Sequence, residues 1–182
     1  MFLWKRKIVS RADDIYLYVP DRSSANEFLD MIRRSRTLHE PWVYPPSNMS
    51  RYTFYLNRLK KRETIGFLIG RNLDDRVAGA ININDLILGG SRSGSLGYYI
   101  DVDFSGMGYM SQALQLVLRY AFQDINLHRL EANIQPMNQA SKALVNKMGF
   151  RKEGFSPKLL NINGIWCDHE RWAILDSEWD LR

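Results

Sequence analysis

Two glycines one residue apart, Gly106 and Gly108, stand where a predicted strand gives way to a predicted helix. Glycine lets a backbone come close to a bulky ligand because it has no Cβ. The first N–H groups of a helix lack partners within the helix, and the helix dipole adds positive character at the same end. The pattern therefore predicts a turn that binds a pyrophosphate through its backbone. A simple turn or a close packing contact would also account for the two glycines.

The helix after these glycines has the clearest pattern in the chain. Its apolar residues keep helical spacing, namely Met110, Ala113, Leu114, Val117, Leu118 and Ala121. Further helices are expected over residues 25–32, 52–59 and 139–148, the last with Asn138 as its N-cap. Strands are expected over residues 8–18, 64–69, 77–83, 96–102 and 129–134, and a closing hairpin is expected over residues 151–160 and 166–175.

The turn at residues 103–108 resembles the acyl-CoA loop of the Gcn5-related N-acetyltransferases, the GNAT family, whose pattern is Gln/Arg-x-x-Gly-x-Gly/Ala. Four later stretches extend the likeness: HRLEANI at residues 128–134, NQAS at 138–141, MGF at 148–150 and NGIWCDH at 163–169. Their order is similar to that of the Rim-type subgroup, which acetylates the N-terminal amines of ribosomal proteins. The likeness covers residues 8–180, so it implies a single N-acetyltransferase domain over that range.

The resemblance implies an α/β (α+β) fold of the GNAT type. In that fold, a mixed, mostly antiparallel central sheet carries helices on both faces, and two strands splay apart to form the cofactor cleft. Acetyl-CoA is then the cosubstrate, no metal is expected, and a backbone N–H near residues 100–102 faces the thioester carbonyl. One preorganised donor of this kind contributes on the order of 3 kcal/mol. The cofactor-binding residues implied are Ile100, Asp101, Val102, Gly106, Met107, Gly108, Tyr109, Met110 and Asn138.

Asp103 departs from the family pattern, because the first position of the loop is usually Gln or Arg. A carboxylate directed into the loop would repel the phosphates of CoA. We therefore expect Asp103 to weaken cofactor binding if its side chain points toward the glycines.

Ser141 is the candidate general acid, because the matching serine of Rim-type relatives faces the cofactor sulfur. Alternatively, it is a capping serine in the first turn of the helix that follows Asn138. Glu131 is the candidate general base, since it faces away from its apolar neighbours on a strand beside the expected gap. It could equally form an ion pair with Arg129 or a lysine, and a water chain would then remove the proton. Some relatives carry a carboxylate at the position of Leu160, which is apolar here.

Aromatic residues are the candidates for the acceptor site. Trp42 lies between prolines, in a loop that cannot form a regular helix. Tyr52 and Trp166 would complete the wall of the site. Tyr52 could also be a core residue, since aromatic side chains at helical spacing mostly pack inward. His39 and Glu40 flank the loop and are weaker candidates for the site.

Length and composition limit the function classes. The chain has 182 residues, of which 45% are hydrophobic, and no apolar run approaches the ~20 residues of a membrane span. Residues 1–7 are charged but no apolar segment follows, so no secretion signal is expected. The single Cys167 fits a reducing cytoplasm. The net charge of +5 could attract RNA, a ribosomal surface or the phosphates of CoA. Aromatic and basic residues do not alternate as in nucleic-acid platforms, so a nucleic acid is not expected as substrate.

Three functions remain open from the sequence. The first is an acetyl-CoA-dependent N-acetyltransferase acting on the N-terminal amine of a protein, which the resemblance implies to be a ribosomal protein. The second is the same reaction on a small amine, such as an antibiotic or a polyamine. The third is a non-catalytic module that binds CoA or the ribosome. Because acceptor loops vary most in such folds, neither the acceptor nor the oligomeric state, monomer or homodimer, follows from the sequence.

Overall fold

Eight strands form one open sheet in the computed structural model, which describes residues 6–179. The strands are β1 (Ile8–Arg11), β2 (Ile15–Tyr18), β3 (Ile65–Arg71), β4 (Val77–Ile87), β5 (Ser93–Ile100), β6 (Arg129–Ile134), β7 (Arg151–Ile162) and β8 (Ile165–Leu175). Their order in the sheet is β1-β2-β3-β4-β5-β6-β8-β7, and only the β5–β6 pair is parallel within the described residues. The expected mixed, mostly antiparallel sheet is confirmed. Residues 1–5 of the basic N-terminal segment, and residue 180 at the end of the expected domain, lie outside the described residues.

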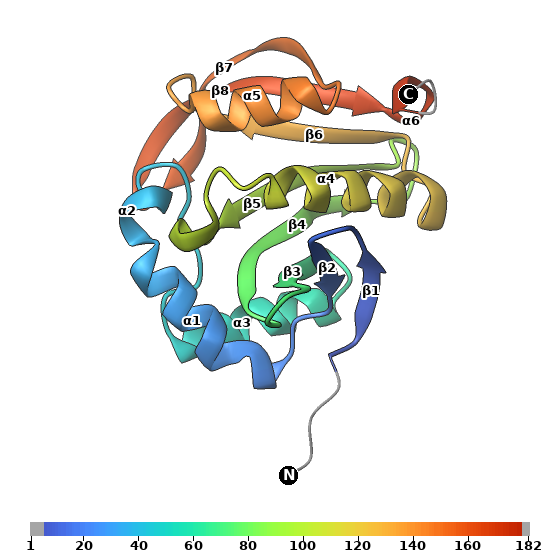
Figure 1. Cartoon of the computed structure of the whole chain (residues 1–182). Helices are drawn as coiled ribbons and strands as arrows, with labels where there is room; N and C mark the ends of the chain where they lie inside the picture. The colour runs from blue at the N-terminus through green and yellow to red at the C-terminus, as the bar shows by residue number, and fades with distance from the viewer. Residues whose placement is uncertain (1–5, 180–182) are drawn as a thin grey trace.

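Six α-helices accompany the strands over residues 6–179, of which five lie between strands and α6 follows the last strand (Figure 1). They are α1 (Ala25–Arg34), α2 (Arg36–His39), α3 (Met49–Lys60), α4 (Tyr109–Arg119), α5 (Gln139–Lys147) and α6 (Asp176–Trp179). None of these helices has both the length and the apolar character needed to cross a membrane.

Several element boundaries differ from the sequence prediction, and three of them involve a change in the type of element. The single strand expected over residues 8–18 is a hairpin of β1 and β2, because the chain turns between them and Ala12 N–H donates to Ile15 O at 2.8 Å. β5 ends at Ile100, and a short 3-10 turn over Val102–Phe104 takes the place of its expected last residues. α4 ends in a π-turn over Tyr120–Asp124.

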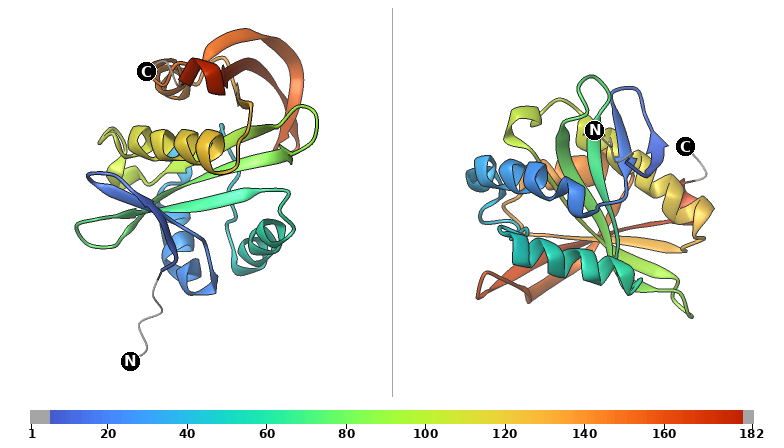
Figure 2. Two further views of the ribbon diagram at one scale, coloured as in Figure 1. Left: turned by 90° about the vertical axis from the view of Figure 1, so that its right-hand side faces the viewer. Right: turned by 90° about the horizontal axis from the view of Figure 1, so that it is seen from below.

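Neighbouring residues along the central strands enter two different cores, because the side chains of a strand alternate between its faces. On β3, Phe67 and Ile69 join the core of α4, whereas Leu68 joins the core of α1 and α3. On β5, Leu96 joins the α4 core and Tyr99 joins the other. Helix α4 therefore covers one face of the sheet while α1 and α3 cover the opposite face (Figure 2).

The sheet opens between β5 and β6. The two strands pair over only three positions, from Ser93 with Arg129 to Ser95 with Glu131. Beyond this point β5 pairs only with β4, and β6 pairs only with β8. The parting leaves a gap in the middle of the sheet, which is the place where the family resemblance puts the cofactor cleft.

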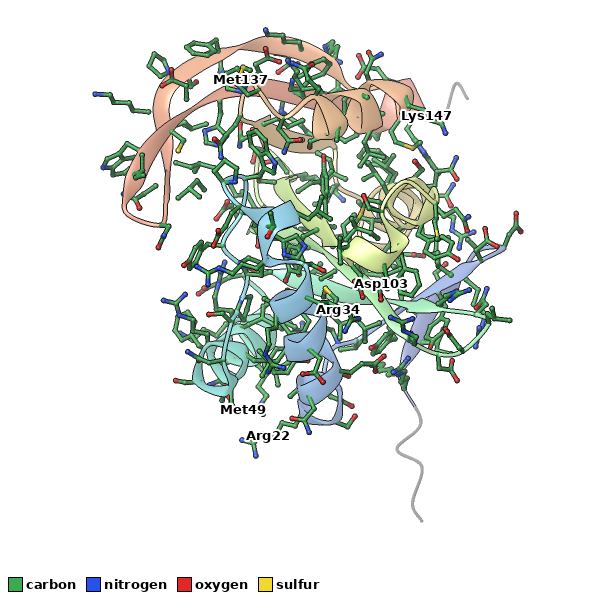
Figure 3. All side chains as sticks on the ribbon, turned by 60° about the vertical axis from the view of Figure 1, so that its left-hand side comes forward. Arg22, Arg34, Met49, Asp103, Met137 and Lys147 are labelled. Carbon is green, nitrogen blue, oxygen red and sulfur yellow. The ribbon has the colours of Figure 1, made fainter. Side chains whose placement is uncertain are left out.

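A buried ion pair joins the end of α1 to the end of β5. Asp101 is fully buried, and Arg34 Nε donates to both of its carboxylate oxygens at 3.0 Å. Val102 N–H donates to Ser35 Oγ at 2.9 Å, and Asp103 N–H donates to Asp101 Oδ1 at 3.1 Å. The side chains of Arg34 and Asp103 lie next to each other, 3.7 Å apart (Figure 3). These contacts fix the turn that leads from β5 to the glycines.

Asp101→Asn should destabilise the fold by about 2–3 kcal/mol, because it removes the buried carboxylate that binds the partly buried guanidinium of Arg34 and leaves only the more exposed Asp103 nearby. The free energy of unfolding, measured by urea denaturation, tests this. As a matched control, Asp30→Asn removes the carboxylate of an ion pair with Arg33 in which both side chains are exposed. The control should change the free energy by less than about 0.5 kcal/mol. Equal effects of the two substitutions would contradict a structural role of the Arg34–Asp101 pair.

Candidate active site

A cleft of about 860 Å³ lies where β5 and β6 part. Residues of both strands line it, together with the first turns of α4 and α5, the end of α2 with the loop that follows, and the β7–β8 hairpin. These segments are far apart in sequence, and the cleft exists only because the sheet brings them to one gap.

The cleft passes through the sheet, so its two halves face different helices. Tyr98 and Ile134 pack with the core of α4. Tyr99 packs with the core of α1 and α3, and its ring lies 5.4 Å from that of His39. We call the first side the α4 half, with Tyr98, Gly106, Gly108, Asn138 and Ser141, and the second side the α2 half, with His39, Trp42, Tyr99 and Asn133.

The glycine turn has the geometry of an anion-binding loop. Gly106 and Gly108 have φ of +80° and +81°, which is the left-handed region that side chains with a Cβ rarely adopt. A Cβ at either position would meet no protein atom within 4 Å, so the space in front of the backbone is open. Gly108 is the N-cap of α4, and the first N–H groups of that helix have no intrahelical partners. The residues present therefore fit a pyrophosphate bound by backbone N–H groups.

Six of the nine predicted cofactor residues line the cleft, namely Ile100, Gly106, Gly108, Tyr109, Met110 and Asn138. The other three are Asp101, Val102 and Met107. The carboxylate of Asp101 is held by Arg34, and the N–H of Val102 by Ser35. The side chain of Met107 is 56% exposed and does not line the cleft.

The backbone N–H of Ile100 in β5 is directed into the gap. Asp101 N–H donates to Ala78 O at 2.7 Å, so residue 101 faces β4. In an antiparallel pair, successive residues direct their N–H and C=O groups to alternate sides. Ile100 therefore directs both groups away from β4, and its carbonyl accepts a hydrogen bond from His39 Nε2 at 2.8 Å. Within the predicted range 100–102, only the N–H of Ile100 is placed to face a ligand.

Asp103 does not direct its carboxylate into the glycine turn. It accepts from Arg76 Nη2 at 2.6 Å and lies 3.7 Å from Arg34 Nε. Two guanidinium groups therefore offset its negative charge. The condition under which Asp103 was expected to repel phosphates is absent from this structure.

Ser141 and Tyr98 meet in the α4 half of the cleft. Tyr98 Oη and Ser141 Oγ are 2.5 Å apart, and either group can be the donor. Burial raises the pKa of Tyr98 to about 12, so its phenol keeps its proton near neutral pH. Asn138 caps α5 by accepting the N–H of Ser141 at 3.1 Å. The cap uses the backbone of Ser141, which leaves its hydroxyl free to serve the cleft.

Glu131 has the structural role that the sequence left open. Arg129 Nε donates to its carboxylate at 2.7 Å, and the same guanidinium also pairs with Glu153. Glu131 stands at the last paired position of β5 and β6, just before the strands part. It is not among the residues that line the cleft, so the structure does not bring this carboxylate to the reaction site.

The three aromatic residues predicted for the acceptor wall have different positions. Trp42 lines the α2 half of the cleft. Tyr52 is fully buried, and its hydroxyl donates to Asp21 O at 3.0 Å, so its assignment to the site was wrong and it is a core residue. Trp166 lies near the exposed tip of the β7–β8 hairpin, outside the cleft, with 60% of its surface exposed. Leu160 and Ile162 of β7 contribute to the wall instead.

Two buried histidines, His39 and His169, line the cleft, and the sequence assigned no role to His169. His39 was only a weaker candidate, and its Nε2 donates to Ile100 O. His169 donates from Nδ1 to Cys167 O at 2.9 Å. Burial lowers the pKa of both imidazoles. The motif at residues 163–169 marked His169, but only the strand register shows on which face it lies.

Within the described part of the chain, no three His, Cys, Asp or Glu side chains gather in a way that could hold a metal ion.

Comparison with known proteins identifies relatives of this chain. Residues 14–151 match the family described as "Acetyltransferase (GNAT) domain". The probable N-acetyltransferase YjcK of Bacillus subtilis is 40% identical over 128 residues, which are 70% of this chain and 71% of YjcK. The [ribosomal protein uS5]-alanine N-acetyltransferase of Escherichia coli is 33% identical over 106 residues, which are 58% of this chain and 55% of that enzyme.

A solved structure shares the fold over nearly the whole chain. It is that of Mycobacterium smegmatis RimJ in complex with CoA-disulfide, with a TM-score of 0.83 and 25% sequence identity. The superposition covers 95% of this chain and 86% of RimJ.

Gly108→Val should weaken the binding of acetyl-CoA strongly, because a branched side chain would fill the open space in front of the turn. Isothermal titration calorimetry measures the affinity. Gly164→Val is the matched control, since Gly164 also has a positive φ, of +87°, with open space around it, but lies in the β7–β8 turn. Both variants carry similar backbone strain. If both variants lose affinity for acetyl-CoA to the same extent, the cause is backbone strain and not the occupation of the phosphate position.

Proposed function

Since this chain belongs to the GNAT acetyltransferase family and is therefore an N-acetyltransferase, we propose that it acetylates the N-terminal amine of a ribosomal protein, with acetyl-CoA as the acetyl donor. We further propose that residues 8–180 act as one domain in the cytoplasm. The similarity to the uS5-alanine enzyme supports a protein amine as the acceptor.

The observation that carries this proposal is that the cleft passes through the sheet and so joins its α4 half to its α2 half. The α4 half has a helix N-terminus and an open glycine turn, which suit the phosphates of CoA. The α2 half has a wall of apolar and aromatic side chains, to which Trp42 and Tyr99 contribute. A thioester held in the gap between β5 and β6 would be reached by an amine that enters from the α2 half. The arrangement therefore supports direct transfer between two substrates bound at the same time.

Acetyl-CoA supplies an activated acetyl group, in which the carbonyl carbon is open to attack by an amine. The N–H of Ile100 is placed to donate to an oxygen in the gap, where it would stabilise the negative charge that develops on the carbonyl. Ser141 holds a proton at Oγ that can go to the departing sulfur. When Tyr98 donates its own proton to Ser141 Oγ, the serine hydrogen is free to point into the cleft. The two hydroxyls together keep this donor in position.

The exposed apolar side chains of the β7–β8 hairpin support a macromolecular acceptor. Ile165 and Trp166, near the tip of the β7–β8 hairpin, are 68% and 60% exposed. Phe155 on the same hairpin is about half exposed. Large apolar side chains in solvent beside a reaction site suit contact with a protein surface better than with a small polar amine.

A mass-spectrometric assay tests the proposed acceptor class. The protein is incubated with acetyl-CoA and three probes: a peptide with a free N-terminal alanine, the same peptide with a blocked N-terminus and an internal lysine, and spermidine. We expect the gain of one acetyl group on the free N-terminus alone. Preferential acetylation of spermidine would favour the small-amine function, and no acetylation of any probe at millimolar acetyl-CoA would contradict the proposal.

Ser141→Ala should lower kcat by about 10²-fold or more and leave the affinity for acetyl-CoA nearly unchanged, since it removes a proton donor and no binding group. Steady-state kinetics with the alanine peptide and calorimetry with acetyl-CoA measure the two quantities. The substitution keeps the backbone N–H that Asn138 caps, so α5 should stay intact. A wild-type kcat in this variant would show that the serine serves only the helix.

A further inference from the structure

The chain needs a group that takes a proton from the acceptor ammonium, and Glu131 is not in the cleft. We propose that Nε2 of His169 is this general base. The inference rests on the proposed acetyl transfer, and it assigns a catalytic role to a residue of the β8 strand that the sequence pattern left without one.

The hydrogen bond of His169 fixes which nitrogen can accept a proton. His169 Nδ1 lies 2.9 Å from Cys167 O. A carbonyl oxygen only accepts, so Nδ1 carries the hydrogen, and in the neutral ring Nε2 then carries a free lone pair. A backbone carbonyl on one nitrogen is the arrangement that orients an imidazole for base catalysis at the other.

The strand register places His169 in the α2 half of the cleft. Ile134 of β6 lies opposite Glu170 of β8, so these two side chains share the face of α4 and α5. Glu170 is bound there by Lys152 at 2.8 Å and lies 3.8 Å from Lys142 of α5. His169 is the next residue along the strand, so its side chain points to the opposite face. That is the side from which the acceptor amine is proposed to enter.

Gln135 brings this part of β8 close to the acceptor loop. It follows Ile134, so in the register of β6 and β8 it lies beside His169. Gln135 Nε2 donates to the carbonyl oxygens of Pro41 and Trp42, at 3.1 and 3.4 Å. His169 and Trp42 therefore border the same half of the cleft, and both line its wall.

The other ionisable groups of the cleft are less suited to accept the proton. His39 uses Nε2–H on Ile100 O, and its Nδ1 is buried away from solvent with no partner among residues 6–179. Asp85 lies beyond Asn84, which pairs with Ser95, so it is displaced from Ile100 by roughly 15 Å along the strands.

The remaining ionisable groups are two cations and the phenols. Arg58 and Lys147 are positively charged and have no free lone pair at neutral pH. Burial raises the pKa of Tyr98 and of Tyr99, so both phenols stay protonated in the pH range of the test. The third phenol, Tyr109, packs in the core of α4, on the face opposite His169.

The ionisation of His169 agrees with this role. Burial lowers the pKa of its imidazole below the usual histidine value, and the nearby Asp168 carboxylate partly opposes this effect. Asp168 also accepts the N–H of Lys158 at 2.8 Å, which holds it on the hairpin. A lowered pKa keeps the imidazole neutral at pH 7, where the α-amine of a peptide, with a pKa of about 8, is mostly protonated.

The proposed step balances in atoms and charge. The acceptor ammonium gives one proton to His169 Nε2, and its nitrogen forms the C–N bond while the C–S bond breaks with its electron pair on sulfur. The nitrogen gives a second proton to solvent as the amide forms. The sulfur gains one proton from Ser141 Oγ, and Ser141 takes one back from solvent. The net products are the amide, the free thiol and one proton, which leaves His169 for solvent.

His169→Asn tests the inference, because the asparagine amide can still donate to Cys167 O while the basic nitrogen is removed. In the wild-type protein, kcat/KM for the alanine peptide should rise with pH through the lowered pKa of His169. In the variant, kcat/KM should fall by about 10²-fold at pH 7. The deficit should shrink as the pH rises past the pKa of the peptide amine, where the free amine needs no base. His128→Asn, a substitution of an exposed histidine at the far end of β6, is the control and should match the wild-type profile.

A second measurement does not depend on activity. ¹⁵N NMR of the imidazoles should show His169 as the neutral Nδ1–H tautomer at pH 7, with its signal missing in His169→Asn. A protonated ring or the Nε2–H tautomer at pH 7 would overturn the inference. The inference would also be overturned if the wild-type protein is active and His169→Asn either leaves the pH profile of kcat/KM unchanged or lowers kcat/KM equally at every pH. If the wild-type protein acetylates no probe amine, the proposed function fails, and this inference fails with it.

Discussion

The parting of β5 from β6 is the constraint on which the site depends. Beyond Ser95 and Glu131, each strand keeps only one partner, so a row of backbone groups faces the gap. Such groups are unfavourable in a protein interior unless they are hydrogen-bonded. His39 donates a hydrogen bond to the carbonyl of Ile100, and the N–H of Ile100 remains for a ligand. A sheet that binds a substrate through its own backbone must leave part of its ladder open, and this one does so at its centre.

The ion pair of Arg34 with Asp101 links that gap to the glycine turn. It fixes the chain at the end of β5, a few residues before Gly106, and it joins α1 to the same point. Arg76 and Arg34 then offset the charge of Asp103. The arginines thus explain how an acidic residue occupies a loop position that is Gln or Arg in the family pattern. The acidic loop and a phosphate-binding function are compatible because the carboxylate is turned away and paired.

The sequence was most informative where one element determines the outcome. The glycine turn, the periodicity of α4 and the cap of α5 by Asn138 all depend on contacts within a few residues. It was less informative for side chains whose role depends on partners far along the chain. An alternation pattern places Glu131 on a face but cannot show that Arg129 will hold it. Helical spacing likewise suits Tyr52 to a core as well as to a site, and its burial against the strands decided between them.

Taken alone, the sequence determined the family and most of the order of the elements, and it predicted the cofactor turn and a candidate acid at Ser141, because these follow from local spacing and from motifs. Only the tertiary structure decided which half of the cleft each side chain enters. The reason is that strand register, set by pairing between segments more than thirty residues apart such as β6 and β8, assigns every residue to a face. Register placed Glu170 with α5 and His169 on the side of His39 and Trp42, and no pattern within β8 contains that information.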